Sequence, residues 1–183
     1  MSELPELWLQ AWHFAARAHR EQKVPGNGFP YVVHVGTVAM EVLVAHHETP
    51  FADPGLALQC ALLHDTIEDT AVTEAEVLAS FGPAVAAGVR ALSKDPALPK
   101  AEAMVDSLRR IREQPREVWA VKLADRITNL QVPPPHWTAE KIVTYRGEAE
   151  KILAALGEAH ATLAARLARK IAAYPPSPSP SSP

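Results

Sequence analysis

Apolar residues recur at helical spacing along nearly the whole chain. In the segment from Pro5 to about Gln22, for example, Leu9, Trp12 and Ala15 fall on one broad side of a helix. Further helices are predicted at about 34–46, 54–70, 74–82, 83–94, 99–113, 116–131, 137–156 and 158–173. The alternation typical of strands is scarce, with room for one short hairpin near residues 23–31. The pattern therefore predicts an all-α protein, a bundle of roughly eight to ten helices.

Turn-forming residues mark where several of these helices begin and end. Asp53 followed by Pro54 is typical of a helix start, and Thr73 with Glu76 forms a capping box. The prolines at 133–135 stop another helix. Residues 175–183 are only proline and serine, which cannot build a packed core. We therefore expect one domain over residues 1–174, followed by a disordered tail over 175–183.

Composition narrows the class of protein. The chain has 183 residues, of which 48% are hydrophobic and 21% charged, as expected for one folded domain. The net charge of −3 gives no basic field for binding nucleic acid or an anionic membrane. No signal-peptide pattern and no apolar run of about 18 residues is present, so a cytoplasmic location is predicted. The single cysteine, Cys60, is expected in the core. The oligomeric state is left open.

An unusual group of polar residues follows the apolar run 61–63. His64, Asp65, Glu68 and Asp69 stand within six residues. On a helix, residues four apart share a face, so His64 would lie beside Glu68 and Asp65 beside Asp69. Such groups beside a core need to be paired or to hold a metal ion. A solvated helix end with a hydrogen-bonded core histidine would produce the same local pattern, so both interpretations stay open at this point.

Two further polar residues in apolar surroundings favour the metal. His34 stands where an apolar helix begins, and Asp125 lies in the apolar segment 121–127. Arg126 points about 100° away around the helix axis, so it is not the obvious partner of Asp125. Two imidazoles and two carboxylates from three helices, without a thiolate, suit Mn, Fe, Ni or Zn.

The chemistry of such a site is hydrolytic. A divalent metal lowers the pKa of a water, and Glu68 and Asp69, one helical turn along, are placed to orient or deprotonate it. These parts favour a phosphoester or phosphoanhydride substrate, because the metal also neutralises charge on a phosphate oxygen. A metal-dependent amide hydrolase would use much the same parts.

Three segments resemble a known family: residues 29–34 (FPYVVH), 61–70 (ALLHDTIEDT) and 121–130 (VKLADRITNL). They are similar to HD-domain phosphohydrolases and, more narrowly, to the hydrolase domain of RelA/SpoT proteins. A chain of this length has no room for the other domains of the long enzymes. It therefore resembles the stand-alone small alarmone hydrolases, a group that includes the metazoan SpoT homologue. The resemblance implies an HD-domain helical bundle that removes the 3′-pyrophosphate of ppGpp and pppGpp, giving GDP and GTP, with a bound Mn²⁺.

The resemblance also implies a role for each candidate residue. The positions that match the family's metal ligands are His34, His64, Asp65 and Asp125. Glu68 and Asp69 match its catalytic acidic pair. Asn129 matches a nucleotide-contacting asparagine, and Tyr145 a substrate-lining tyrosine. Lys141, one turn before Tyr145, is placed to meet a phosphate as a point charge.

The chain departs from the family pattern on the side that would meet the nucleobase. The loop before His34 lacks the arginine that stacks on the base, and Lys23 is the only stand-in. Val35, Gln131 and Val132 also replace the usual residues. These changes spare the metal chemistry but leave the purine open, so adenosine alarmones of the ppApp type and the 2′-phosphate of NADPH are alternative substrates. A general HD nucleotide phosphohydrolase and a non-catalytic binding module are the remaining alternatives.

Overall fold

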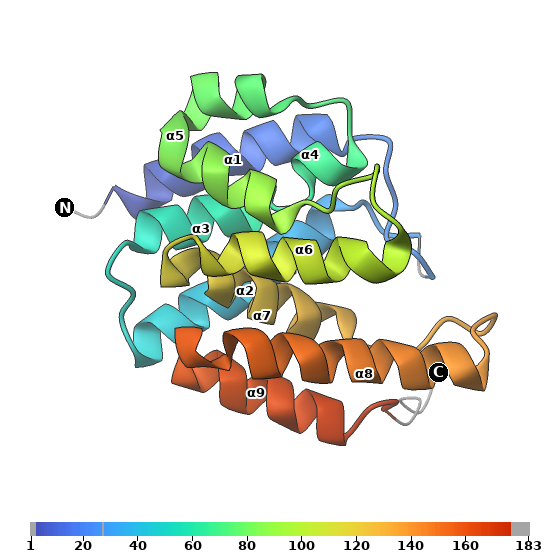
Figure 1. Ribbon diagram of the computed structural model, residues 1–183. Coiled ribbons are helices and arrows are strands. Elements are labelled where there is room, and N and C mark those ends of the chain that lie inside the picture. The colour runs from blue at the N-terminus through green and yellow to red at the C-terminus, as the bar shows by residue number, and fades with distance from the viewer. Residues whose placement is uncertain (1–2, 27, 177–183) are drawn as a thin grey trace, which may run out of the picture.

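The computed structural model describes residues 3–26 and 28–176, over which the chain is a bundle of helices (Figure 1). The elements in chain order are α1 (Leu4–Ala18), α2 (Val32–Glu48), α3 (Pro54–Leu63), α4 (Thr66–Asp69), α5 (Glu74–Leu92), α6 (Lys100–Arg112), α7 (Arg116–Asn129), α8 (Ala139–Leu156), the 3₁₀ turn η1 (Gly157–Ala159) and α9 (Ala161–Ala172). In the described part of the loop between α1 and α2, the expected hairpin is reduced to one antiparallel bridge between Lys23 and Pro30. The prediction of an all-α bundle is confirmed.

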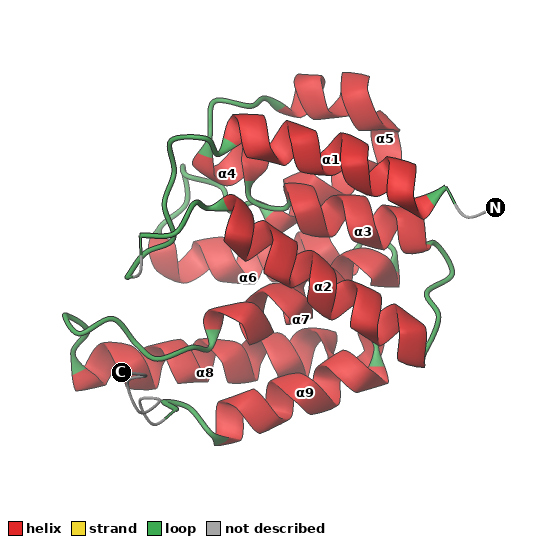
Figure 2. Ribbon diagram, turned by 180° about the vertical axis from the view of Figure 1, so that it is seen from behind, coloured by secondary structure: helices red, strands yellow, loops and turns green. Residues whose placement is uncertain are grey.

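Helix α3 forms the centre of the core. Every residue from Leu56 to Leu63 is buried. A helix that is apolar on all sides must be covered on all sides, and α1, α2, α5 and α7 pack around this one. Seen from behind, α1 and α2 flank it (Figure 2). The Asp53 carboxylate accepts the backbone N–H of Leu56 at 2.9 Å and caps its first turn, as the Asp53-Pro54 signal predicted.

The helix predicted over 54–70 is interrupted at His64 and Asp65, so the expectation of one continuous helix is wrong. Thr66 Oγ1 donates to Leu63 O at 2.7 Å, and His64 Nδ1 bonds Ala61 O at 2.8 Å. These side chains bond carbonyls that a continuing helix would have bonded through its backbone. The break turns His64 and Asp65 towards α2 and α7.

Helix α5 is kinked where the sequence predicted two helices. Gly82 has φ 82° and ψ 174°, a left-handed conformation that favours glycine, and Pro83 restarts the helix. The Thr73 capping box forms in full at the beginning of α5. By length and composition α5 also qualifies as a membrane-spanning helix, but this is weak evidence because core helices pass the same test. Here α5 packs against α3 and α6.

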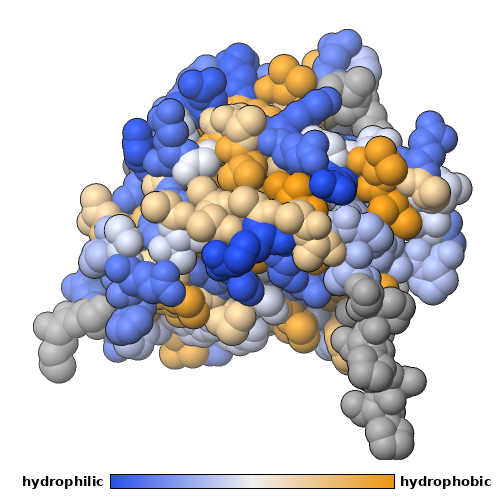
Figure 3. All heavy atoms as spheres, turned by 90° about the horizontal axis from the view of Figure 1, so that it is seen from below, coloured by the Kyte–Doolittle hydropathy of each residue, from blue (hydrophilic) through white to orange (hydrophobic). Residues whose placement is uncertain are grey.

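Helices α8 and α9 close one side of the bundle, against α7 (Figure 1). Arg166 of α9 donates through Nη2 to Oε1 of Glu41 on α2 at 2.6 Å, which ties the two helices together. Seen from below, this side of the molecule mixes apolar and charged side chains (Figure 3). Of the tail predicted over 175–183, residues 177–183 lie outside the described residues, so the domain boundary at 174 stays a prediction.

Candidate metal centre

Four polar side chains from separate parts of the chain converge inside the bundle. His34 comes from the first turn of α2, His64 and Asp65 from the break after α3, and Asp125 from α7. Nε2 of His34 lies 3.3 Å from Nε2 of His64 and 3.5 Å from Oδ1 of Asp125. Nε2 of His64 lies 3.0 Å from Oδ2 of Asp65. The structure therefore brings all four predicted ligands together, and we call them the metal cluster.

The end of α3 sets the orientation of His64. A backbone carbonyl can only accept, so the contact with Ala61 O places a proton on Nδ1 and leaves Nε2 to face the cluster. The Nε2 atoms of His34 and His64, so close to each other and to carboxylate oxygens, need a cation among them. Protons meet that need in the metal-free protein. The same nitrogen and oxygen donors, three of them within 4.8 Å of one another, also fit a divalent metal ion.

Other side chains also form hydrogen bonds with the two carboxylates. The Tyr31 hydroxyl donates to Oδ2 of Asp65 at 2.6 Å. Lys122 Nζ donates to Oδ2 of Asp125 at 3.0 Å, and Asn129 Nδ2 donates to its Oδ1 at 2.5 Å. Hydrogen bonds of this kind orient the ligands in metal sites. The carboxylates are therefore arranged before any metal ion arrives.

Charges within the metal cluster are strongly coupled. Burial lowers the pKa of His64, but Asp65 and Asp125 outweigh burial and raise it to about 10. The pKa of His34 is raised as well, because hydrogen bonds with Asp125 and Asp65 outweigh the effect of burial. Burial raises the pKa of both aspartates, yet the histidines, and Lys122 beside Asp125, hold these pKa values well below the usual range. The carboxylates stay ionised and attract positive charge.

The acidic pair lies next to the metal cluster, on α4, and its two members have different partners. Glu68 accepts from Lys94 twice, from Nζ and from the backbone N–H, each at 2.8 Å. Asp69 accepts from Gln22 Nε2 at 3.0 Å. Burial and the negative charge of Asp65 raise the pKa of Asp69. A carboxylate with a raised pKa beside a cation site is suited to accept a proton from water.

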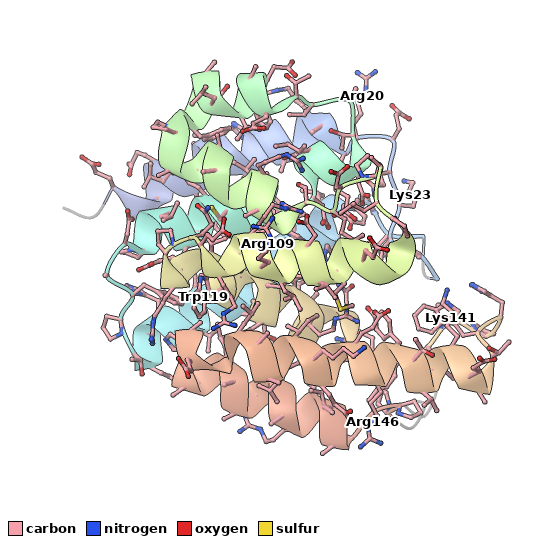
Figure 4. The ribbon with its side chains drawn as sticks, viewed as in Figure 1. Arg20, Lys23, Arg109, Trp119, Lys141 and Arg146 are labelled. Atoms are coloured by element: carbon pink, nitrogen blue, oxygen red, sulfur yellow. The ribbon has the colours of Figure 1, made fainter. Side chains whose placement is uncertain are left out.

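The residues expected to contact substrate fall into two groups. Asn129 is bonded to Asp125 within the metal cluster. Tyr145 and Lys141 both contact Trp137, with ring centroids of Tyr145 and Trp137 5.0 Å apart and Lys141 Nζ 4.7 Å from the Trp137 ring. Lys23 is exposed, in the loop between α1 and α2. Figure 4 shows Lys23 and Lys141 at the same end of the molecule, from this loop and from the beginning of α8.

Three residues around the site were not predicted from the sequence. Lys122, three residues before Asp125 and on the same helix face, is its salt-bridge partner, whereas from the sequence only Arg126 was considered. That spacing was a usable signal. Tyr31 and Lys94, in contrast, reach their partners across 34 and 26 positions of the chain. Nothing local in the sequence indicates those pairings.

Comparison with known proteins identifies the family of the chain. The family model described as the HD domain matches residues 11–163. The guanosine-3′,5′-bis(diphosphate) 3′-pyrophosphohydrolase MESH1 of Homo sapiens is 36% identical over 149 residues, which cover 79% of this chain and 80% of that protein. MESH1 of Danio rerio is 35% identical over 142 residues, 75% of this chain and 77% of that protein.

The fold has a solved counterpart as well. A structure of a metazoan orthologue of SpoT, described as hydrolysing ppGpp and playing a role in starvation responses, matches with a TM-score of 0.79. The two sequences are 29% identical, and the match covers 91% of this chain and 94% of that one. The helical bundle, the matched residues and these relatives agree, and the chain belongs to the HD-domain family.

Proposed function

We propose that the protein is a cytoplasmic, metal-dependent hydrolase that removes the 3′-pyrophosphate from guanosine 3′,5′-bis(diphosphate). A water oxygen bonds to the phosphorus next to O3′, the bond between that phosphorus and O3′ breaks, and O3′ takes up a proton. The products are GDP and pyrophosphate. The observation that carries the proposal is the convergence of His34, His64, Asp65 and Asp125, in a chain similar to proteins named for this reaction.

The metal cluster would hold one divalent ion, for which we propose Mn²⁺. Two imidazole nitrogens and two carboxylate oxygens, without a thiolate, support an ion of this class. A divalent ion there would lower the pKa of the attacking water and neutralise charge on a phosphoryl oxygen. The protein's own contribution is orientation. Lys122 bonds Oδ2 of Asp125 and leaves its Oδ1 facing the two histidines, and Tyr31 bonds Oδ2 of Asp65, the oxygen that lies 3.0 Å from His64 Nε2.

The acidic pair would handle the proton of the attacking water. We assign that step to Asp69, because its raised pKa suits proton transfer and its described hydrogen bond uses only Oδ2. Glu68 accepts a hydrogen bond from Lys94, which fixes the Glu68 carboxylate in place. The Glu68 carboxylate would then be an acceptor, and the Lys94 ammonium a nearby positive charge, for the substrate. The leaving O3′ needs a proton, and the Asp69 carboxylate can return the one it took.

The nucleotide would lie between the metal cluster and the beginning of α8. Lys141 provides a compact positive charge for phosphate. Tyr145 provides a ring that can pack on the base. Asn129 would contact the nucleotide from the edge of the metal cluster. The ammonium of Lys23 is compact and cannot stack on a purine as a planar guanidinium would. Adenosine alarmones of the ppApp type and NADPH are therefore the alternative substrates.

One assay separates these substrates. Metal-stripped protein is supplied with Mn²⁺ and incubated with ppGpp, pppGpp, ppApp, NADPH and GTP, and the products are resolved by anion-exchange chromatography. We expect GDP and pyrophosphate from ppGpp, at a higher kcat/KM than for the other compounds. His64→Ala should lose activity and bound metal together, and His13→Ala, which changes an exposed histidine, should lose neither.

Other outcomes would assign a different function. Faster release of orthophosphate from NADPH would favour the NADPH alternative. Faster turnover of ppApp would favour an adenosine alarmone. Metal binding without turnover of any compound would favour a binding module.

A further inference from the structure

A chain of hydrogen bonds links the end of α1 to the acidic pair. It consists of His19, Gln22 and Asp69, none of which belongs to the metal cluster. His19 follows the last residue of α1 and is 2% exposed. Its Nδ1 lies 2.6 Å from Gln22 Oε1, and Gln22 Nε2 lies 3.0 Å from Asp69 Oδ2. Gln22 therefore bridges a buried imidazole and a carboxylate at the site.

The direction of each hydrogen bond follows from the atoms involved. A carboxylate can only accept, so the NH₂ group of Gln22 faces Asp69 and its Oε1 faces His19. Oε1 also only accepts, so His19 Nδ1 donates. Nε2 of His19 is buried and has no hydrogen-bond partner in the described structure, as expected for the unprotonated nitrogen of a neutral ring. If the amide of Gln22 turned over, oxygen would meet oxygen at Asp69 and N–H would meet N–H at His19.

The main chain of Gln22 is held as firmly as its side chain. Its N–H donates to His19 O at 2.9 Å, and its carbonyl accepts from the N–H of Tyr31 at 3.0 Å. The His19 ring packs on the Tyr31 ring, with centroids 4.9 Å apart. Gln22 is thus a fixed point in the loop between α1 and α2, beside a tyrosine that bonds Asp65.

We propose that His19 and Gln22 are positioning residues for the hydrolysis. His19 locks the amide of Gln22, and Gln22 holds one oxygen of Asp69 so that the other oxygen faces the attacking water. The inference rests on the proposed function, in which Asp69 acts on that water. Asp69 lies on a four-residue helix, and Gln22 Nε2 is the hydrogen-bond donor that orients its carboxylate. Proton transfer depends steeply on such placement.

Matched substitutions separate positioning from packing. His19→Phe keeps the ring that packs on Tyr31 but removes the donor. His19→Asn keeps an N–H donor near the place of Nδ1 but removes the ring. Gln22→Met keeps the length of the side chain and removes both of its hydrogen bonds. Gln10→Met is the control, because Gln10 Nε2 also makes one hydrogen bond from α1, to Ser80 O of α5 at 3.0 Å.

We expect Gln22→Met to lower kcat by about tenfold or more, the usual scale for a hydrogen bond to a charged group. His19→Phe should lower kcat to a similar extent, because Gln22 then loses the contact that fixes its amide. KM and bound Mn²⁺ should stay within about twofold, since neither residue belongs to the cluster. His19→Asn should restore most of kcat, and Gln10→Met should leave it unchanged. The double variant of His19→Phe and Gln22→Met should be no slower than either single variant, because the residues act in series.

A purely structural role predicts a different result, which would overturn the inference. Both His19 variants would then lower the melting temperature while kcat, measured well below melting, stayed at the wild-type value. Loss of metal together with activity would overturn it as well.

One readout does not depend on turnover. ¹⁵N NMR of the His19 imidazole should show the proton on Nδ1 and an unprotonated Nε2 near neutral pH. A proton on Nε2 would overturn the inference even if ppGpp hydrolysis were confirmed. The Nδ1 proton in a protein that hydrolyses nothing would leave the hydrogen-bonded chain standing and would overturn the proposed function, and with it the role in hydrolysis.

Discussion

Metal binding should compete with a proton on His64, and this competition can be measured. In the metal-free protein, Asp65 and Asp125 overcome burial and raise the pKa of His64 to about 10. A metal ion binds the neutral imidazole, so the proton on Nε2 must leave first. At pH 7 the protonated ring outnumbers the neutral ring by roughly a thousandfold, which is three pKa units. The metal affinity at pH 7 should be weakened by about the same factor.

The raised pKa of His64 predicts how steeply Mn²⁺ binding depends on pH. Between pH 7 and 9 the dissociation constant for Mn²⁺ should fall at least about tenfold per pH unit, with at least one proton released per ion bound, because His64 must lose its proton and the pKa of His34 is raised too. A histidine of ordinary pKa, about 6.5, would be fully neutral above roughly pH 7.5 and give no slope there. Isothermal titration of metal-stripped protein with Mn²⁺ at pH 7.0, 7.5, 8.0 and 8.5, in two buffers of different ionisation enthalpy, measures both quantities.

The same proton affects stability without metal. The pKa of His64 is raised in the folded protein, so its contribution to folding is complete below about pH 6.5 and is lost as the pH rises towards 10. The loss of the His64 proton alone should lower the melting temperature of EDTA-treated protein by about 3–5 °C per pH unit between about pH 6.5 and 10. Mn²⁺-loaded protein should not show this fall. Affinity that is constant above pH 7.5, with no proton release, would refute the coupling of His64 to the carboxylates. His64→Ala is the control and should show neither binding nor proton release.

Three further predictions concern single substitutions. Asp69→Asn should keep the fold and the bound metal but lower kcat by about 10²–10⁴-fold. Kinetics beside metal analysis tests this, and an unchanged kcat would mean that Asp69 does not act on the attacking water. Lys23→Arg should lower KM for guanosine substrates more than it changes kcat, because a guanidinium stacks on a base better than an ammonium. A wild-type preference for guanine over adenine of about a thousandfold, ~4 kcal/mol, would show that another group reads the base. Gly82→Ala should destabilise the fold by ~1 kcal/mol, because φ is 82° at this position. Gly147→Ala on α8, where the added methyl meets no atom within 4 Å, should stabilise the fold by ~0.5–1 kcal/mol. Urea denaturation compares the two variants, and equal effects would contradict the strain assigned to Gly82.

Most of the fold was predictable from local sequence signals, because a helix is decided by residues three and four positions apart. The capping box of Thr73 and Glu76 formed as expected, and the Gly82-Pro83 pair produced the expected break. Cys60 was expected in the core, and it lies in the buried part of α3. Composition and helical spacing alone were enough for the all-α class.

The members of the metal cluster were also predictable by residue type. His34, His64, Asp65 and Asp125 stand in apolar surroundings, where an unpaired polar group is costly and therefore indicates a partner or an ion. Their convergence, however, joins segments far apart in the chain. Neither periodicity nor composition determines such contacts.

Only the tertiary structure decided how the side chains around the site are held. It ended α3 at Leu63, so that His64 bonds Ala61 through Nδ1 and presents Nε2 to the cluster. It also brought Gln22 to Asp69 across 47 positions of the chain. The physical reason is that a helix end and a side-chain hydrogen bond are each worth only about 1 kcal/mol locally. Packing from α2 and α7 therefore decides between alternatives that are nearly equal in energy for the isolated segment.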